Sequence, residues 1–234
     1  KNKVNEYVNV LYVKGSGWDL DTLEPPGLPG VLLDHLLKLR KLDFLTDEDM
    51  INEQRTHLLD ASSPNPSVET LLHAFLPHKF IDHSHADASL IIANQPNAEK
   101  ICKDIYGNKI GIVPYIMPGF DLAKKSAEIY EKDKNIEGLI LLNHGLFSFG
   151  QTAKESYDRH INLVNIAERF IEDRETIKLT LTDNRSNKTD ENKFINTLAP
   201  ILRGIYHKLT DKSWVVNLRK NQKTMDFASS KEAL

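Results

Sequence analysis

The 234-residue sequence has a single cysteine, Cys102, which excludes an internal disulfide framework. Secretion is therefore unsupported, and we expect a cytoplasmic protein. No apolar run approaches the roughly 18 to 20 residues that cross a bilayer, so no membrane span is expected. The first residues lack a signal-peptide pattern and an initiating methionine, from which we expect that the chain begins inside a longer protein and that an N-terminal part is missing.

An excess of positive charge is also missing. The 30 Lys and Arg residues are outnumbered by 33 Asp and Glu residues, and the formal net charge is -3. Because no basic face is available to neutralise phosphate backbones, nucleic acid is not expected as a partner. With 40% hydrophobic and 27% charged residues, the composition is that of a globular protein that can bury a substantial core. Small-molecule chemistry is the favoured class of function.

Strand-like segments alternate with helical ones along the chain, which predicts the α/β class. The predicted strands cover residues 7–14, 79–85, 109–117 and 137–145. The predicted helices cover residues 30–41, 46–60, 68–76, 86–95, 121–132, 152–171 and 199–209. Ser67 is the predicted N-cap of the third helix, and Thr152 with Glu155 forms a capping-box pattern at the start of the sixth.

A polar segment, residues 182–193, is typical of a linker or an exposed loop. We therefore expect a first domain over residues 1–181. Residues 182–234 are expected to form the linker, a helix and a hairpin over residues 213–229, packed on the first domain or continuing it.

The stretch IDHSHADA, residues 81–88, contains two histidines two residues apart. Alternate side chains of a strand share a face, so His83 and His85 could bind one ion. A zinc ion that takes part in chemistry usually has a third protein ligand, and His144, at the end of an apolar strand, is the obvious candidate. The alternative is that these are ordinary surface or hydrogen-bonded histidines.

Five other histidines have no comparable pairing, and we interpret them as structural or solvent-exposed. These are His35, His57, His78, His160 and His207.

Glu69 is the best candidate for acid–base chemistry, because a carboxylate in a first helical turn can lean toward a metal. Such a glutamate is also common simply because it favours the helix dipole. The turn Gly15, Ser16, Gly17 and the hydroxyl of Ser67 could offer amides and hydroxyls to a phosphate or another anion, although a Gly-Ser-Gly turn alone is a weak signal.

Four motifs occur together in the chain: KGSGWDL, PNPSVETLLHAF, DHSHADA and LLNHGLFSFG. In this order and spacing they resemble the class II aldolase/adducin family. The resemblance is closest to the aldolase part of bifunctional rhamnulose-1-phosphate aldolase/alcohol dehydrogenase proteins, and it covers residues from about 10 to 170.

The resemblance implies a three-layer α/β/α fold with a largely antiparallel central sheet. It also implies a zinc ion, or another divalent transition metal, on His83, His85 and His144, with Glu69 as the catalytic residue. Phosphate contacts are implied for residues 15–17 and Ser67. Val68 stands where some family members carry a second serine, which puts the identity of the substrate in doubt.

The implied reaction is that of a lyase. A ketose 1-phosphate, such as rhamnulose or fuculose 1-phosphate, is cleaved reversibly to dihydroxyacetone phosphate and an aldehyde. The resemblance further implies a homotetramer in which a tyrosine of a neighbouring subunit donates a proton, and a dehydrogenase domain fused to this one in the full-length protein. Tyr106 and Tyr115 are candidates for that tyrosine, although positions in the aromatic core would explain both equally well. Two other functions stay open: an epimerase of pentulose 5-phosphates, and a non-catalytic, adducin-like binding module.

Overall fold

The computed structural model describes residues 4–174, 191–216 and 221–228. The chain divides into two units, residues 1–174 and residues 175–234, and each is described by itself. The domain boundary predicted after residue 181 lies outside the described residues and stays a prediction.

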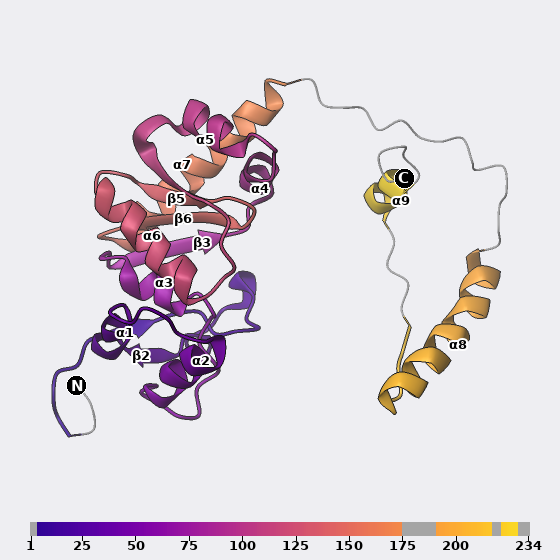
Figure 1. Cartoon of the computed structure of the whole chain (residues 1–234). Helices are drawn as coiled ribbons and strands as arrows, with labels where there is room; N and C mark the ends of the chain where they lie inside the picture. Colours follow the sequence, from indigo (N-terminus) through magenta and orange to yellow (C-terminus); the bar gives the residue numbers. More distant parts are fainter. Residues whose placement is uncertain (1–3, 175–190, 217–220, 229–234) are drawn as a thin grey trace. The chain divides into compact units, whose positions relative to one another are not determined.

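A four-stranded sheet with the order β3-β6-β5-β4 forms the middle of the first unit (Figure 1). Its strands are β3 (Phe80–Ser84), β4 (Ile110–Val113), β5 (Gly138–Leu141) and β6 (Gly145–Gly150). Strands β3 and β5 both pair antiparallel with β6, whereas β4 pairs parallel with β5. The sheet is therefore mixed, with two antiparallel pairings and one parallel pairing.

Helices cover both faces of this sheet and complete the predicted three-layer α/β/α arrangement (Figure 1). On one face lie α3 (Thr70–Phe75) and α6 (Phe120–Lys132); on the other lie α4 (Asp87–Ala93), α5 (Ala98–Tyr106) and α7 (Ala153–Glu172). Leu139 packs in the first of the two resulting cores and Ile140 in the second. Burial on both faces explains why β5 is apolar throughout instead of alternating.

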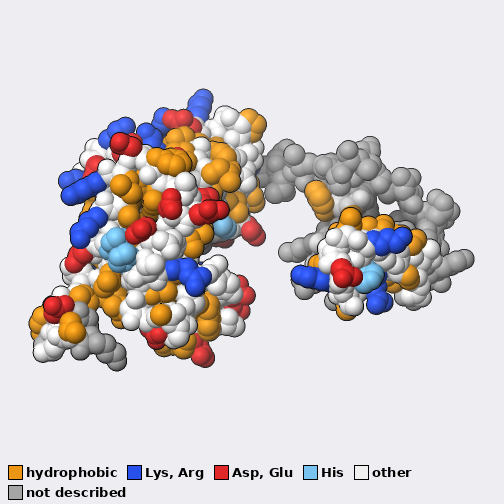
Figure 2. Space-filling model, turned by 60° about the horizontal axis from the view of Figure 1, so that its bottom comes forward, with side chains coloured by type: hydrophobic (Ala, Val, Ile, Leu, Met, Phe, Trp, Pro, Cys, Tyr) orange, Lys and Arg blue, Asp and Glu red, His pale blue; other side chains and the backbone are white. Residues whose placement is uncertain are grey.

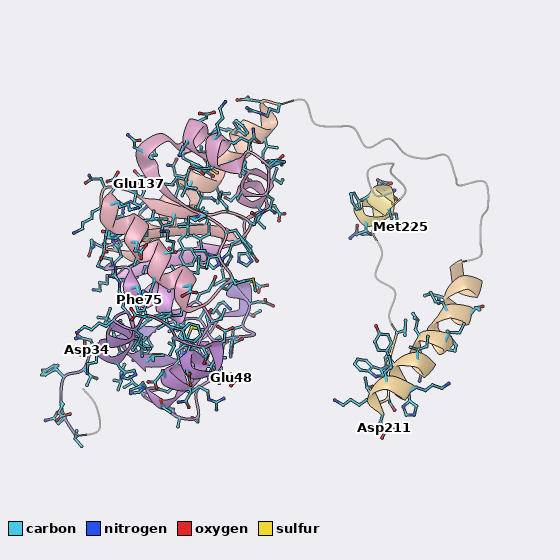
Figure 3. All side chains as sticks on the ribbon, in the orientation of Figure 1. Asp34, Glu48, Phe75, Glu137, Asp211 and Met225 are labelled. Carbon is cyan, nitrogen blue, oxygen red and sulfur yellow. The ribbon has the colours of Figure 1, made fainter. Side chains whose placement is uncertain are left out.

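Side chains fill the space between the sheet and its helices, as Figure 3 shows around the labelled Phe75 of α3. Phe75 is 3% exposed and belongs to the core on the α3 and α6 face. On the face drawn in Figure 2, acidic and basic side chains are interspersed.

The beginning of the chain forms a smaller antiparallel sheet of β1 (Val10–Tyr12) and β2 (Gly30–Leu32). Helices α1 (Leu33–Leu39) and α2 (Asp47–Thr56) follow it. The helix predicted from Gly30 starts three residues later, because residues 30–32 pair with β1 instead. An apolar run such as GVLL suits either structure, so periodicity alone did not separate the strand from the helix.

Besides β2, one strand and one α-helix of the first unit were not predicted from the sequence: β6 and α5. The predicted N-cap at Ser67 is wrong, since α3 begins at Thr70 with Glu69 as its N-cap residue. Thr152 does cap α7, because its side chain accepts a hydrogen bond from the Glu155 amide at 3.1 Å.

The described parts of the second unit are α8 (Glu191–Thr210) and α9 (Gln222–Ala228). The hairpin predicted over residues 213–229 is wrong where the structure describes it, because residues 222–228 are helical. The predicted linker lies outside the described residues up to residue 190, and its last three residues already belong to α8. Within the described ranges, none of the helices has the length and hydropathy of a membrane span.

Candidate metal centre

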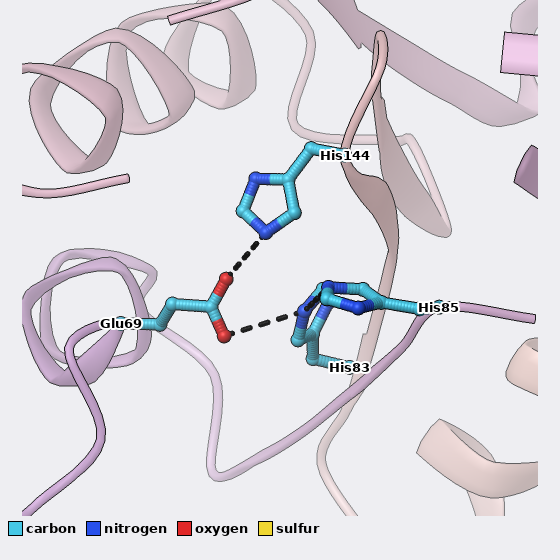
Figure 4. A group of neighbouring side chains, drawn as sticks. All are labelled: Glu69, His83, His85 and His144. Carbon is cyan, nitrogen blue, oxygen red and sulfur yellow. Dashed lines mark hydrogen bonds and ion pairs between the residues drawn. The ribbon is translucent and has the colours of Figure 1, made fainter. Parts of the chain in front are cut away.

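Four side chains from three distant segments meet at one end of the sheet (Figure 4). His83 lies in β3 and His85 just beyond the end of that strand, while His144 lies in the turn between β5 and β6. Glu69 stands at the start of α3. The structure therefore brings together the three predicted metal ligands and the predicted catalytic carboxylate.

The distances in this cluster suit a transition-metal ion. One ligand atom from each of the four side chains lies within 4.8 Å of all the others, and the Nε2 atoms of His83 and His85 are 3.1 Å apart. Ligand atoms around a tetrahedral zinc ion lie about 3.3 Å apart, given Zn–N bonds of 2.0 to 2.1 Å. The planes of the three rings meet at 81°, 83° and 66°, so the rings approach a common point from different directions.

Hydrogen bonding fixes which nitrogen of His83 faces the cluster. Its Nδ1 lies 3.0 Å from the Leu146 carbonyl oxygen, which can only accept, so Nδ1 carries a proton. Burial lowers the pKa of His83 to about 4, so the ring is neutral and Nε2 presents a lone pair. That lone pair faces Glu69 Oε2 at 3.3 Å. Two electron-rich atoms at this distance repel each other, and a cation between them turns the repulsion into attraction.

Glu69 contributes the negative charge of the cluster. Burial by itself raises the pKa of this carboxyl, but the hydrogen bond from His144 stabilises the anion, and the pKa falls below its ordinary value. Oε1 accepts from His144 Nε2 at 2.7 Å, and the side chain is only 13% exposed. Glu69 is therefore an anionic group beside the three imidazoles, able to act as a ligand or as a proton acceptor.

A chain of hydrogen-bonded polar groups anchors β3 on the face of the sheet opposite to His83. Ser84 Oγ lies 2.6 Å from His160 Nε2, and His160 Nδ1 lies 2.9 Å from Ser148 Oγ. The Ser148 hydroxyl donates its only proton to the Ser156 carbonyl at 3.0 Å, so it must accept from His160 Nδ1. Burial lowers the pKa of His160, which keeps the ring neutral, so Nε2 accepts from the Ser84 hydroxyl. His160 is structural, as predicted from the sequence.

A second group of candidate ligands, His35, Glu53 and His57, has a different geometry. The rings of His35 and His57 are stacked, with their planes at 8°, and His57 Nδ1 lies 2.8 Å from the backbone oxygen of Glu53. Because imidazole binds a metal in the plane of its ring, two parallel rings do not point at one ion. His35 and His57, predicted to be structural or solvent-exposed, therefore form a hydrogen-bonded stack whose rings do not converge on an ion.

A pocket of about 320 Å³ opens beside the cluster. Ser67, Glu69 and His83 line it, together with Lys14, which the sequence reasoning missed. The turn at residues 15–17 is not part of its lining. The only clue in the sequence was the position of this lysine directly before the Gly-Ser-Gly turn. The predicted substrate contacts of residues 15–17 and Ser67 stay predictions.

The chain is similar to a known family and to known proteins. A family model described as "Class II Aldolase and Adducin N-terminal domain" matches residues 4–171. The curated protein "Uncharacterized oxidoreductase YuxG" of Bacillus subtilis (strain 168) is 35% identical over 229 residues, which are 97% of this chain and 33% of that protein. The chain thus spans about a third of the length of this relative.

A solved structure, the N-terminal class II aldolase domain of a conserved protein from Thermoplasma acidophilum, is 45% identical to this chain. The match has a TM-score of 0.69 and covers 73% of this chain and 78% of that one. The family match spans the whole described sheet and all four clustered residues. The chain belongs to the class II aldolase/adducin family.

Proposed function

We propose that the protein is a zinc-dependent lyase that cleaves a ketose 1-phosphate reversibly into dihydroxyacetone phosphate and an aldehyde. Rhamnulose and fuculose 1-phosphate are the substrates to test first. The observation that carries the proposal is the place of Glu69, an anionic carboxylate in contact with two of three clustered imidazoles. His83, His85 and His144 would hold the ion.

When bound, the ion would polarise the substrate carbonyl and stabilise the negative charge that develops on its oxygen. Glu69 supplies the proton transfer. In the condensation direction it removes a proton from the carbon next to the carbonyl, and the electron pair of that C–H bond forms the new bond to the aldehyde carbon. The aldehyde oxygen then takes up a proton from an acid donor, so that atoms and charge balance. Cleavage follows the same steps in reverse.

For the acid donor we propose Tyr115, acting in the active site of a neighbouring subunit of a homotetramer. Tyr106, the other candidate, is 3% exposed, and burial raises its pKa to about 12, so its hydroxyl is a poor donor to a second chain. Tyr115 is 54% exposed, and its hydroxyl contacts Met117 Sδ at 2.9 Å. Exposure supports this choice, because only an exposed tyrosine can reach another subunit.

The test is release of dihydroxyacetone phosphate by the zinc-loaded, full-length gene product, with rhamnulose 1-phosphate, fuculose 1-phosphate and a pentulose 5-phosphate as substrates. Glu69→Gln should lower turnover by at least about 100-fold, since general acid–base catalysis contributes that much, while zinc stays bound. Tyr115→Phe should lower turnover too, and sedimentation should give a tetramer.

Unchanged turnover in Glu69→Gln would contradict the proposal. Interconversion of pentulose 5-phosphates without release of dihydroxyacetone phosphate would reassign the protein as an epimerase. A purified protein that holds no divalent metal and turns over none of the three substrates would fit an adducin-like binding module.

A further inference from the structure

The pocket beside the metal centre contains a further imidazole, that of His73. This residue lies in α3, four positions after Glu69, and lines the pocket together with Glu69 and His83. Side chains four residues apart share one face of a helix, so the His73 ring and the Glu69 carboxylate are directed to the same side of α3. His73 is therefore a neighbour of the cluster, although it is not one of its candidate ligands.

The side chain of Phe147 holds the His73 ring in place. The centroids of these two rings are 5.4 Å apart, and their planes are tilted by 59°. Phe147 also stacks on His83, with the centroids 4.1 Å apart and the planes at 17°. Because Phe147 is fully buried, one well-packed ring sets the positions of both His73 and a candidate metal ligand.

The ring of His73 has no hydrogen-bond partner in the part of the chain that the structure describes. Burial lowers its pKa to about 4, so the ring is neutral and carries one N–H donor and one lone pair. His83 and His160 are kept neutral in the same way, but both bond to protein groups. Buried polar groups are nearly always satisfied, so the nitrogens of His73 need a partner from the pocket.

The charges near the ring determine which kind of ligand it accepts. The carboxylates of Glu69 and Asp82 both lie close enough to His73 to act on its pKa, which they raise, although burial has the larger effect. Two negative charges near the ring disfavour an anion such as a phosphate. A hydroxyl group is neutral and both donates and accepts, so it matches the donor and the acceptor of a neutral imidazole.

We propose that His73 hydrogen-bonds a hydroxyl group of the substrate and thereby selects polyhydroxylated substrates over analogues that lack hydroxyl groups. This inference rests on the proposed function, because it places the hydroxylated carbons of the ketose 1-phosphate in the pocket that Glu69 and His83 line. His73 binds the substrate in this arrangement and takes no part in the proton transfer by Glu69.

The experiment measures binding to the zinc-loaded, full-length protein by calorimetry, with two probes that a lyase cannot cleave. The first is rhamnulose 1-phosphate with its carbonyl reduced to an alcohol, which keeps the phosphate and the hydroxyl groups. The second is propyl phosphate, which keeps the phosphate alone. Since neither probe has the carbonyl that the cleavage requires, binding is measured separately from turnover.

His73→Phe keeps an aromatic ring against Phe147 and removes both hydrogen-bonding atoms. We expect it to raise the Kd of the reduced sugar phosphate by about 3- to 10-fold, the effect of losing a neutral hydrogen bond. The Kd of propyl phosphate should stay within about 2-fold, because this probe has no hydroxyl group to lose a bond. His73→Gln keeps a donor and an acceptor, so it should bind the reduced sugar phosphate more tightly than His73→Phe does.

His78→Phe is the matched control. The ring nitrogens of His78 are also buried without a hydrogen-bond partner among the described residues, but this ring stacks on Phe149 and does not line the pocket. Both probes should bind to His78→Phe as they bind to the native protein.

An equal loss of affinity for the two probes in His73→Phe, or no loss for the reduced sugar phosphate, overturns the inference, because the ring then acts through packing alone. Thermal unfolding shows whether the variant is folded. His73→Leu, which also lacks hydrogen-bonding atoms, takes the place of His73→Phe if that variant unfolds below the native temperature.

The outcomes separate this inference from the proposed function. Binding of the reduced sugar phosphate that depends on His73, in a protein without lyase activity, supports the hydroxyl site and assigns it to another reaction. Lyase activity together with probe binding that ignores His73 supports the proposed function and overturns this inference.

Discussion

The hydroxyl of Ser84 meets Nε2 of His160 at 2.6 Å, which ties the residue between His83 and His85 to helix α7. His160 continues through Ser148 to the Ser156 carbonyl, so β3 is anchored on the face opposite to the ligands. The imidazole of His160 is not part of the cluster, but it fixes the segment that presents His83 and His85.

His160→Ala should weaken zinc binding although every ligand remains. Outer-shell partners typically change metal affinity by about 10- to 100-fold, and we expect an effect of that size, measured by competition with a chromophoric chelator. His207→Ala is the matched control, because His207 lies exposed on α8. An affinity for zinc that is equal in the His160→Ala and His207→Ala proteins would show that the anchor has no influence on the site.

Removal of a ligand should abolish stable zinc binding. His83→Ala and His144→Ala each leave two imidazoles, and we expect the zinc content, measured by mass spectrometry after dialysis, to fall from one ion per chain to well below one. His35→Ala and His57→Ala are the controls, since their stacked rings do not converge on an ion. A second ion per chain that disappears in either control would contradict our interpretation of the stack.

Gly145→Ala should disturb the centre without replacing a ligand. A Cβ at this position would lie 2.8 Å from the Ser84 carbonyl oxygen and 2.9 Å from His83 Cε1, so β3 has to move. We expect a loss of about 1 to 3 kcal/mol in the free energy of unfolding, together with weaker zinc binding. Denaturant unfolding and chelator competition measure the two effects.

Gly204→Ala provides the comparison for that glycine. No atom lies within 4 Å of the Cβ it would gain, and the residue is inside α8. Alanine should stabilise the helix by up to about 1 kcal/mol and leave zinc affinity unchanged. If Gly145→Ala also left the zinc affinity and the stability undiminished, the close approach of β6 to His83 and His85 would have no influence on the site.

Cys102 should be unreactive in the folded protein. Its side chain is fully buried, and burial raises the pKa of the thiol to about 11. Since the pKa is raised, the thiol stays protonated at pH 8, and a thiol reagent that needs the thiolate should modify it only after unfolding. Titration with a chromogenic disulfide should give close to zero thiols natively and one in denaturant. One fast-reacting native thiol would contradict the packing of α5.

The sequence was sufficient for the fold class, most helices and the identity of the four clustered residues. The pairing of His83 with His144 followed from reading both as strand ends, and the sheet does bring those ends together. Strand β6 escaped detection because it continues the apolar run of β5 after a turn of three residues, 142–144. That turn relies on Asn143 at a φ of 57°, a left-handed conformation that asparagine tolerates.

The partners of the site could not be derived from the sequence. Lys14 lines a pocket with residues far away in the chain, and His160 bonds to the distant Ser84. No local pattern reports such neighbours. The capping role assigned to Ser67 failed for a related reason. Its hydroxyl does accept a backbone hydrogen bond, but from an amide before the helix begins. The N-cap rule identified Ser67 Oγ correctly as an acceptor, but it assigned this atom to the start of α3, which begins at Thr70.

Strand β3 carries ligand and anchor on alternate residues, with His83 toward one layer of helices and Ser84 toward the other. Inserting or deleting one residue ahead of His83 would exchange the two faces, sending the imidazole toward α7 and the hydroxyl toward Glu69. The number of residues between Phe80 and His85 can therefore change only by an even number if His83 is to keep its face of the sheet. Length changes in this segment of functional relatives should come in even numbers or be confined to the loops on either side.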